Sequence, residues 1–338
     1  MNKKQISLVG FGILSLITIA GIVYFTKYKT TCSKNADYRV AIFVPAVHPA
    51  MDEIVRGFTE TITDASKKCY AFDEYNANGN STLLRAQADE IIQHNYDLVF
   101  TIGAKCSQTI FELSKKRQSL VPQIFSAIDD PIAMGIIASL QAPGGHVTGV
   151  TATTLYEQQV DALLRVKPTV KNILLVYDPA HGTGLETTKE EFERVLRAKD
   201  ITLHTIEVAH PNEIAQKVPS FLNGIDVVLM LTDHTVCSGI DSLITLCGRH
   251  GITLYASDLN SGDKGAALSF GVREYDYGML SAHLAKRILE EKQSPASISV
   301  FGPQKQYLKI NTKTMDKQGL HLTKEALDQL VQEGSIII

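Results

Sequence analysis

The sequence predicts an α/β protein made of two doubly wound parallel sheets, preceded by an N-terminal membrane-anchor helix. Apolar, β-branched runs alternate with longer helical patterns, which is typical of parallel sheets covered on both faces. The alternation occurs in two series, one before about Gly149 and one after it. An uncharged apolar run precedes both series. The 338 residues are enough for two packed domains of ordinary size.

The element order follows from these patterns. We predict strands over residues 40–44, 70–75, 98–102, 123–127, 147–151, 173–177, 203–208, 227–231, 253–256 and 266–270. We predict helices over residues 51–66, 82–94, 107–116, 155–166, 186–199, 213–222, 238–250 and 277–291. Asn80 and Asp233 stand where capping residues begin helices. Ligands of such sheets bind at the carboxyl ends of the strands, so a cleft is expected there, between the two sheets.

The N-terminal apolar run covers residues 6–25 and contains no charged residue. Twenty helical residues at about 1.5 Å each span the roughly 30 Å core of a bilayer. The run is longer than a secretory h-region, and the sequence after it lacks a small-residue cleavage pattern. We therefore predict an uncleaved signal anchor over residues 1–29 and a stalk over 30–37. A cleaved signal peptide and a buried core helix are the alternatives. Lysines flank both sides of the run, so the charge bias leaves the orientation open.

The composition excludes some partners. The net charge is −3 and the pI is about 6.4, so no electrostatic footprint for nucleic acid is present.

Five cysteines are present: Cys32, Cys69, Cys106, Cys237 and Cys247. Their spacing matches no zinc pattern and includes no Cys-x-x-Cys. Cys32 follows the apolar run closely, but it lacks the small apolar residues that lipid attachment requires. Cys237 and Cys247 are ten positions apart and could pair in an oxidising compartment. They are predicted to lie on one helix, however, so we expect buried free thiols there.

Motifs for catalysis are missing from the sequence. It contains no Gly-x-Ser-x-Gly, no His-Glu-x-x-His and no Gly-x-x-x-x-Gly-Lys-[Ser/Thr]. The turn after the first strand contains His48 and Pro49 instead of a glycine-rich dinucleotide loop. The histidines are scattered without ligand spacing. We therefore predict a protein that is not an enzyme and that holds neither a cofactor nor a metal.

Seven short motifs resemble those of ABC-transporter substrate-binding proteins of the tryptophan/tyrosine-binding type, in the same order and spacing. They lie at residues 40–52, 76–80, 97–103, 129–131, 146–150, 232–236 and 257–278, and the tail at 310–320 is also similar. The resemblance covers essentially residues 38–338.

The resemblance implies the type I periplasmic-binding-protein fold. Lobe 1 would cover residues 38–150 and be completed by about 273–306. Lobe 2 would cover 151–272 and be completed by about 307–338. The chain would cross between lobes near Thr151, Val272 and Tyr307. It also implies a monomeric extracytoplasmic body at the cell membrane that captures a small solute, including aromatic amino acids in the family. ABC permease and ATPase subunits would then transport the ligand.

Two segments depart from the family pattern where ligand groups would be held. Ala104 and Lys105 replace a frequent Thr-Pro-Ala segment, and Thr183 lies in a segment that replaces an Asn-Ser pair. Gly103, Ala104 and Lys105 run into a helix N-terminus, where free N–H groups favour an anion such as a ligand carboxylate.

The other candidate ligand-binding residues also follow strands. Asp129, Asp233 and Asp258 are candidates for pairing with a ligand ammonium, because a desolvated ammonium requires a charged partner. Asp129 and Asp233 are alternatively helix caps. His48 and Tyr177 are candidates for packing on an apolar or aromatic group. A capping role for His48 and a hinge-packing role for Phe270 are the alternatives.

Two other functions fit the same elements. A membrane-tethered sensor of the same fold would report the ligand instead of delivering it. A two-Rossmann-domain enzyme acting on sugar nucleotides would require a phosphate loop, which the sequence lacks.

Overall fold

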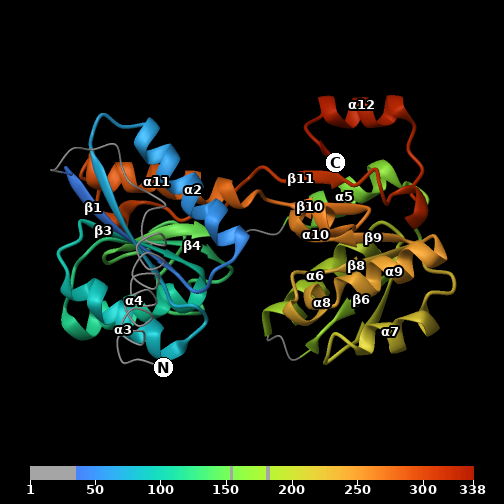
Figure 1. Cartoon of the computed structure of the whole chain (residues 1–338), viewed down its shortest axis with the longest axis horizontal. Helices are drawn as coiled ribbons and strands as arrows, with labels where there is room; N and C mark the ends of the chain where they lie inside the picture. The colour runs from blue at the N-terminus through green and yellow to red at the C-terminus, as the bar shows by residue number, and fades with distance from the viewer. Residues whose placement is uncertain (1–35, 153–154, 180–182) are drawn as a thin grey trace, which may run out of the picture. The chain divides into compact units, whose positions relative to one another are not determined.

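The computed structural model describes residues 36–152, 155–179 and 183–338. The chain divides into two compact units. Unit 1 contains the chain up to Thr151 together with Gly278–Phe301, and unit 2 contains Ala152–Tyr277 together with Gly302–Ile338. The colours in Figure 1 show this interleaving, because orange α11 lies with the blue and green elements while red β11 and α12 lie with unit 2.

Unit 1 is built on a five-stranded sheet, sheet A, with the strand order β2-β1-β3-β4-β5. All of its strand pairs are parallel. The strands are β1 (Tyr38–Val44), β2 (Tyr70–Asn76), β3 (Leu98–Ile102), β4 (Gln123–Ile128) and β5 (Val147–Thr151). The helices are α2 (Pro49–Asp64), α3 (Ser81–Gln93), α4 (Gly103–Arg117), most of α11 (Glu274–Leu289) and the 3₁₀ turn η3 (Pro295–Ser297).

Helices cover both faces of sheet A. On one face, Phe43 and Val99 join a buried cluster with residues of α3 and α4 such as Ile91 and Ile110. On the other face, Phe58 of α2 stacks on Phe100, with ring centroids 4.2 Å apart. The alternation of buried side chains along β3 thus supplies both layers of the core.

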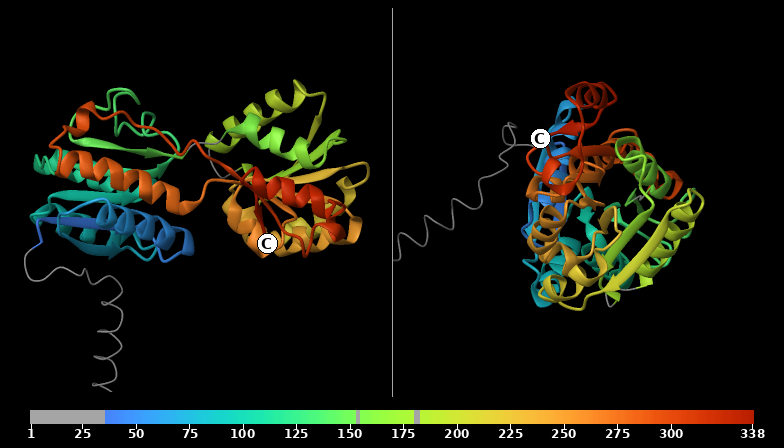
Figure 2. Two further views of the ribbon diagram at one scale, coloured as in Figure 1. Left: turned by 90° about the horizontal axis from the view of Figure 1, so that it is seen from above. Right: turned by 90° about the vertical axis from the view of Figure 1, so that its right-hand side faces the viewer.

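α11 runs alongside α2 (Figures 1 and 2), and one glycine makes this contact possible. A Cβ atom on Gly278 would lie 2.0 Å from the carbonyl oxygen of Ile54 and 2.6 Å from the amide nitrogen of Phe58. Only a residue without a side chain fits between these backbones.

Unit 2 is built on a seven-stranded sheet, sheet B, with the strand order β12-β11-β10-β9-β8-β6-β7. The strands are β6 (Asn172–Tyr177), β7 (Thr202–Glu207), β8 (Val227–Met230), β9 (Thr253–Ala256), β10 (Leu268–Gly271), β11 (Tyr307–Ile310) and β12 (Ile336–Ile337). The helices and 3₁₀ turns are α5 (Tyr156–Val166), α6 (Thr183–Arg197), α7 (Glu213–Lys217), η2 (Val218–Phe221), α8 (His234–Ser238), α9 (Ile240–His250), α10 (Leu259–Lys264), η4 (Asp316–Gln318) and α12 (Lys324–Gln332).

Sheet B also buries both faces. Leu175 lies in a cluster with Leu163 of α5 and Phe192 of α6. Its neighbour Leu174 points to the opposite cluster, which includes residues of α7 and α9 such as Ile214 and Leu243.

The predicted α/β fold with parallel sheets is confirmed, with several corrections. Sheet B is mixed, because β10 and β11 are antiparallel, and β11 brings β12 into the sheet. The helix predicted over 238–250 begins at His234 and is interrupted at Gly239. α10, β11, α12 and β12 were not predicted, since all four are too short to show a clear period.

α4 begins at Gly103, four residues before the predicted start. Gly103 has φ +75°, which glycine adopts without strain, and this lets β3 pass directly into the helix.

The predicted anchor over residues 6–25 lies outside the described residues. Within the described ranges, no helix is both long and apolar enough to cross a membrane.

The cysteines fall into two groups. Cys106, Cys237 and Cys247 are free, which confirms the expectation for Cys237 and Cys247, although Cys237 is only partly buried. Burial raises the pKa of the Cys106 and Cys247 thiols to about 12 and that of Cys237 to about 11, so they are poor nucleophiles. Cys69 is disulfide-bonded.

Candidate ligand-binding site

The candidate residues of unit 1 follow neighbouring strands of sheet A. His48 follows β1, Gly103 follows β3, and Asp129 follows β4. Because these strands are parallel and adjacent, their carboxyl ends share one edge of the sheet. The structure therefore brings the unit 1 candidates to one edge.

His48 has a structural task at this edge. Its Nδ1 accepts a hydrogen bond from the backbone N–H of Ala50 at 3.1 Å, so it is the N-cap of α2, with Pro49 in the first turn. The capping alternative therefore describes His48. Its ring is nevertheless exposed, so a ligand contact stays a prediction.

The N-terminus of α4 is the most open feature of this edge. Its N-cap position is Ile102, and among the described residues no side chain caps the helix. Ala104 and Lys105 in the first turn are exposed. A Cβ on Gly103 would meet no described atom within 4 Å. Unpaired N–H groups, the positive end of the helix dipole and a lysine together favour an anion.

Asp129 is exposed at the same edge, although neighbouring protein atoms still restrict its hydration. This partial desolvation and the charge of Asp130 raise the pKa of the Asp129 carboxyl. It is Asp130 that caps the following turn, because its Oδ1 accepts from the N–H groups of Ile132 and Ala133. Asp129 is thus the carboxylate of this pair without a capping role.

The candidate residues of unit 2 follow strands of sheet B. Tyr177 ends β6, Asp233 follows β8, Asp258 follows β9, and Phe270 lies in β10. β6, β8, β9 and β10 are parallel neighbours, so these positions share the carboxyl edge of sheet B.

Asp233 is completely buried and serves the backbone. Its Oδ1 accepts from the N–H groups of Thr235 and Val236 at 2.8 and 3.1 Å, and its Oδ2 accepts from the N–H of Asp178 at 2.5 Å. The capping alternative therefore describes this residue. Asp178 was not among the predicted residues, and its Oδ2 accepts from the Thr235 hydroxyl at 2.6 Å. Its place directly after Tyr177 was the available signal.

Asp258 and Glu274 form an acidic pair at this edge. Asp258 caps α10 through Ser261, whose N–H and hydroxyl both donate to it. Glu274 begins α11 and is half-buried. Burial, and next the charge of Asp258, raise the pKa of Glu274 to about 7. Glu274 was not predicted either, because it lies three residues beyond the end of β10.

Tyr177 and Phe270 belong to the core of unit 2. The Tyr177 hydroxyl donates to Glu207 Oε1 at 3.0 Å, and Lys189 Nζ lies 5.0 Å from the centroid of its ring. Phe270 pairs with Leu308 of β11. Ligand contacts by these two residues stay predictions. Thr183 begins α6, but its side chain lies outside the described part of the chain.

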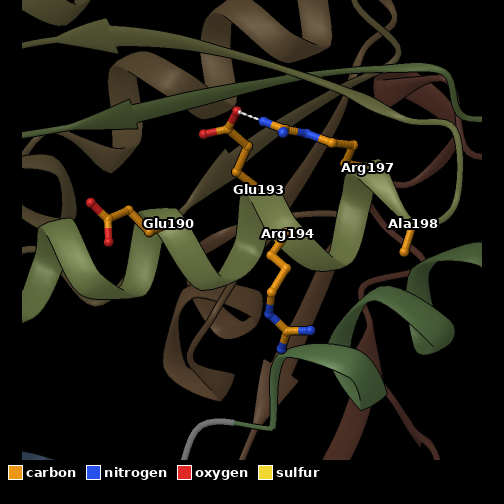
Figure 3. A pocket seen from close by; sticks show the side chains of 5 residues that line it. All are labelled: Glu190, Glu193, Arg194, Arg197 and Ala198. Carbon is orange, nitrogen blue, oxygen red and sulfur yellow. Dashed lines mark hydrogen bonds and ion pairs between the residues drawn. The ribbon is translucent and has the colours of Figure 1, made fainter.

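A surface groove on unit 2 lies away from these residues. It runs along α6 and is lined by Glu190, Glu193, Arg194, Arg197 and Ala198 (Figure 3). Glu193 and Arg197 form an exposed i,i+4 ion pair at 2.6 Å. The groove lies on the second half of α6, whereas the carboxyl edge of the sheet is next to its first residues. Ion pairs at i,i+4 spacing stabilise the exposed face of a helix.

Within the described residues, no group of histidine, cysteine, aspartate and glutamate side chains has the geometry of a metal site.

Comparison with known proteins identifies the family of this chain. The family model for ABC transporter substrate-binding proteins matches residues 39–333. The chain belongs to this family. Its body therefore has the fold that the sequence motifs resembled, and its family binds substrates for transport.

Three similar proteins extend this result. The tyrosine-binding protein of Clostridioides difficile (strain R20291) is 24% identical over 341 residues, covering 97% of this chain and 95% of that protein. The ABC domain in complex with L-Trp from Streptococcus pneumonia is 24% identical, with a TM-score of 0.70, covering 90% of this chain and 100% of that one. A ligand-free, open substrate-binding protein with adhesive properties from Clostridium difficile is 20% identical, with a TM-score of 0.78, covering 89% and 99%. The two solved structures establish the shared fold.

Proposed function

We propose that this substrate-binding protein captures an amino acid outside the cytoplasm and delivers it to the permease and ATPase of an ABC importer. The family match supports the transport role. The printed names of two similar proteins, a tyrosine-binding protein and a domain in complex with L-Trp, support an amino acid as the ligand.

The observation that carries the proposal is the open N-terminus of α4. A ligand carboxylate accepting from the N–H groups that follow Gly103 would replace the missing side-chain cap. Lys105, in the first turn, would add a positive charge. No chemistry on the ligand is required for this role.

The ammonium of the ligand would be bound by Asp258 and Glu274. Both carboxylates lie at the carboxyl edge of sheet B, and the raised pKa of Glu274 reflects a poorly hydrated negative charge that a cation would stabilise. Asp258 keeps its bonds to Ser261 in this arrangement, because a carboxylate has further lone pairs.

The side chain of the ligand would be apolar or aromatic. Val47 and Ile132 lie in the loops after β1 and β4 and are 71% and 44% exposed, although both are large apolar residues. Burying this apolar surface against a ligand would be favourable.

We further propose that one ligand binds to both carboxyl edges and thereby stabilises a closed form over an open one. The N-terminal run over residues 6–25 would retain the body at the membrane.

The test is thermal shift of residues 33–338 against a library of amino acids, sugars and sugar nucleotides. A ligand present at 100 times its Kd stabilises by about 2.7 kcal/mol, which shifts the melting temperature measurably. We expect a shift from one or a few amino acids. A shift from sugar nucleotides alone would support the enzyme alternative and contradict the proposal.

Analogues of the active amino acid test the assignment of the two charged groups. The decarboxylated amine and the N-acetylated acid should each lose most of the shift. With the cognate ligand, the radius of gyration from small-angle scattering should fall while the mass stays that of a monomer. An unchanged curve at saturating ligand would contradict the closing motion.

A further inference from the structure

Cys69 differs from every other cysteine that the structure describes. It is disulfide-bonded, whereas Cys106, Cys237 and Cys247 are free. The sequence has five cysteines, and the fifth, Cys32, lies outside the described residues. Within one chain, therefore, Cys32 is the sole remaining partner for Cys69.

The residues around Cys69 hold the chain that follows Cys32. The N–H groups of Asp37 and Tyr38 both donate to the Cys69 carbonyl, at 2.8 and 3.1 Å. In return, Asp37 Oδ2 accepts from the Cys69 N–H at 2.8 Å. Lys68 pairs with the same carboxylate at 3.5 Å. These bonds lower the pKa of Asp37, the one to the Cys69 N–H most of all, so the contact persists into mildly acidic solution.

This contact places residue 32 within reach. Cys32 lies five positions before Asp37, and five steps of chain span at most about 18 Å. A disulfide requires Cα atoms roughly 4.4–6.8 Å apart, a separation that this length of chain permits. We propose that Cys32 and Cys69 form a disulfide that fixes the segment before β1 to the start of β2.

The bond forms by oxidation of both thiols. One cysteine thiolate attacks the disulfide of an extracytoplasmic thiol oxidase, which releases one of the oxidase's thiolates. The second cysteine thiolate then displaces the oxidase from the mixed disulfide. The two electrons and both thiol protons leave the chain, and the oxidase ends as a dithiol. An oxidising compartment is required, so the inference rests on the extracytoplasmic location of the proposed function.

The disulfide determines how the body is tethered. Cys69 precedes β2, so the bond lies at the amino end of sheet A, opposite the carboxyl edge with the candidate ligand-binding residues. Any force exerted by the membrane segment would act on unit 1 at this disulfide. A sulfur in a disulfide cannot also carry a lipid thioether, so the bond excludes lipid attachment at Cys32.

The test uses the full chain exported from the cytoplasm in bacteria. The protein is denatured without reductant, alkylated, digested and mapped by mass spectrometry. We expect one linked pair of peptides containing Cys32 and Cys69, together with three alkylated cysteines. In Cys32→Ser the linked pair should vanish and Cys69 should become the fourth alkylated residue. The matched control Cys106→Ser should retain the linked pair.

Three outcomes would overturn the inference: alkylated or lipid-modified Cys32, Cys69 linked to another cysteine of the chain, or a disulfide-linked dimer on a non-reducing gel. Thermal shift with the cognate amino acid on the same preparation separates this result from the proposed function. If the ligand still binds but Cys32 is not linked to Cys69, the disulfide alone is wrong.

Discussion

The carboxyl edges of sheets A and B use their polar groups in opposite ways. In unit 1, α4 begins without a side-chain cap among the described residues, and its first turn is exposed. In unit 2, α8 and α10 are capped by Asp233 and Asp258, the acidic residues that follow β8 and β9. One edge therefore leaves backbone donors open, while the other uses its carboxylates internally.

The difference shows that position after a strand does not by itself assign a residue to ligand binding. A fully buried carboxylate whose two oxygens both accept backbone hydrogen bonds, as in Asp233, has little capacity left, and its removal affects folding first. An uncapped helix has unsatisfied donors that water or a ligand must satisfy. Removal of the Asp233 side chain should therefore reduce stability, whereas removal of the Lys105 side chain should reduce binding.

The largest effect is expected for Asp233→Ala. The change leaves the N–H groups of Asp178, Thr235 and Val236, of which the first and last are buried, without their acceptor, so the free energy of unfolding should fall by about 2–4 kcal/mol. Urea unfolding of the body measures this loss. Asp129→Ala at the other edge is the control and should change stability by less than about 0.5 kcal/mol. Similar losses from both variants would remove the distinction between the edges.

The next effect concerns Glu274 and pH. The pKa of Glu274 is about 7 in the folded chain and 4.5 as its ordinary value. Between these two values the folded state keeps a proton that the unfolded chain has lost, so stability should fall as pH rises and level off above about 7. Glu274→Gln should remove this slope and make the protein about 1–3 kcal/mol more stable than the wild type at pH 8. The two proteins should be equally stable below pH 4.5, and equal slopes in urea unfolding from pH 4.5 to 7 would contradict the assignment.

A smaller loss is expected for Gly103→Ala at the edge of unit 1. The space beside Gly103 is open, so the cost is the strain of φ +75° alone, roughly 1–2 kcal/mol. Gly248→Ala in α9 is a matched control. Its Cβ would also meet no described atom within 4 Å, but its φ is not positive, so this change should stabilise by about 0.5–1 kcal/mol. Opposite signs in urea unfolding are the expected result.

The smallest effect is expected for Lys105→Ala. Calorimetry with the cognate amino acid should show a loss of about 0.5–1 kcal/mol, the range for a charge at a helix terminus, with unchanged stability. Lys116→Ala in the last turn of the same helix is the control. It changes the net charge by the same amount as Lys105→Ala but should leave the affinity for the ligand unaltered. Equal affinities for the two variants would show that Lys105 makes no contribution to ligand binding.

The sequence predicted most strands of both sheets, because continuous apolar runs such as residues 173–177 and 227–231 are most stable in a buried sheet. It also predicted which residues reach the carboxyl edges. It could not rank them, because capping by His48 or Asp233 depends on how far the side chain turns back to the backbone. That choice is fixed by φ and ψ at one residue, which a single sequence does not reveal.

Strand β11 and the pairing of Asp258 with Glu274 were missed for a different reason. The antiparallel return of β11 is set by its register with β10, and the acidic pair of Asp258 and Glu274 joins positions from different elements. Such pairings depend on tertiary packing and leave no local pattern.

α11 has a mechanical consequence, because the chain changes units inside it, between Tyr277 and Gly278, while the helix itself is continuous. At Gly278 the helix touches the backbone of α2 directly, without a deformable side chain between them. A displacement of α11 within unit 1 would therefore displace α2 with it, and α2 starts at His48, on the edge where we expect the ligand to bind. The two helices thus form one stiff pair behind that edge.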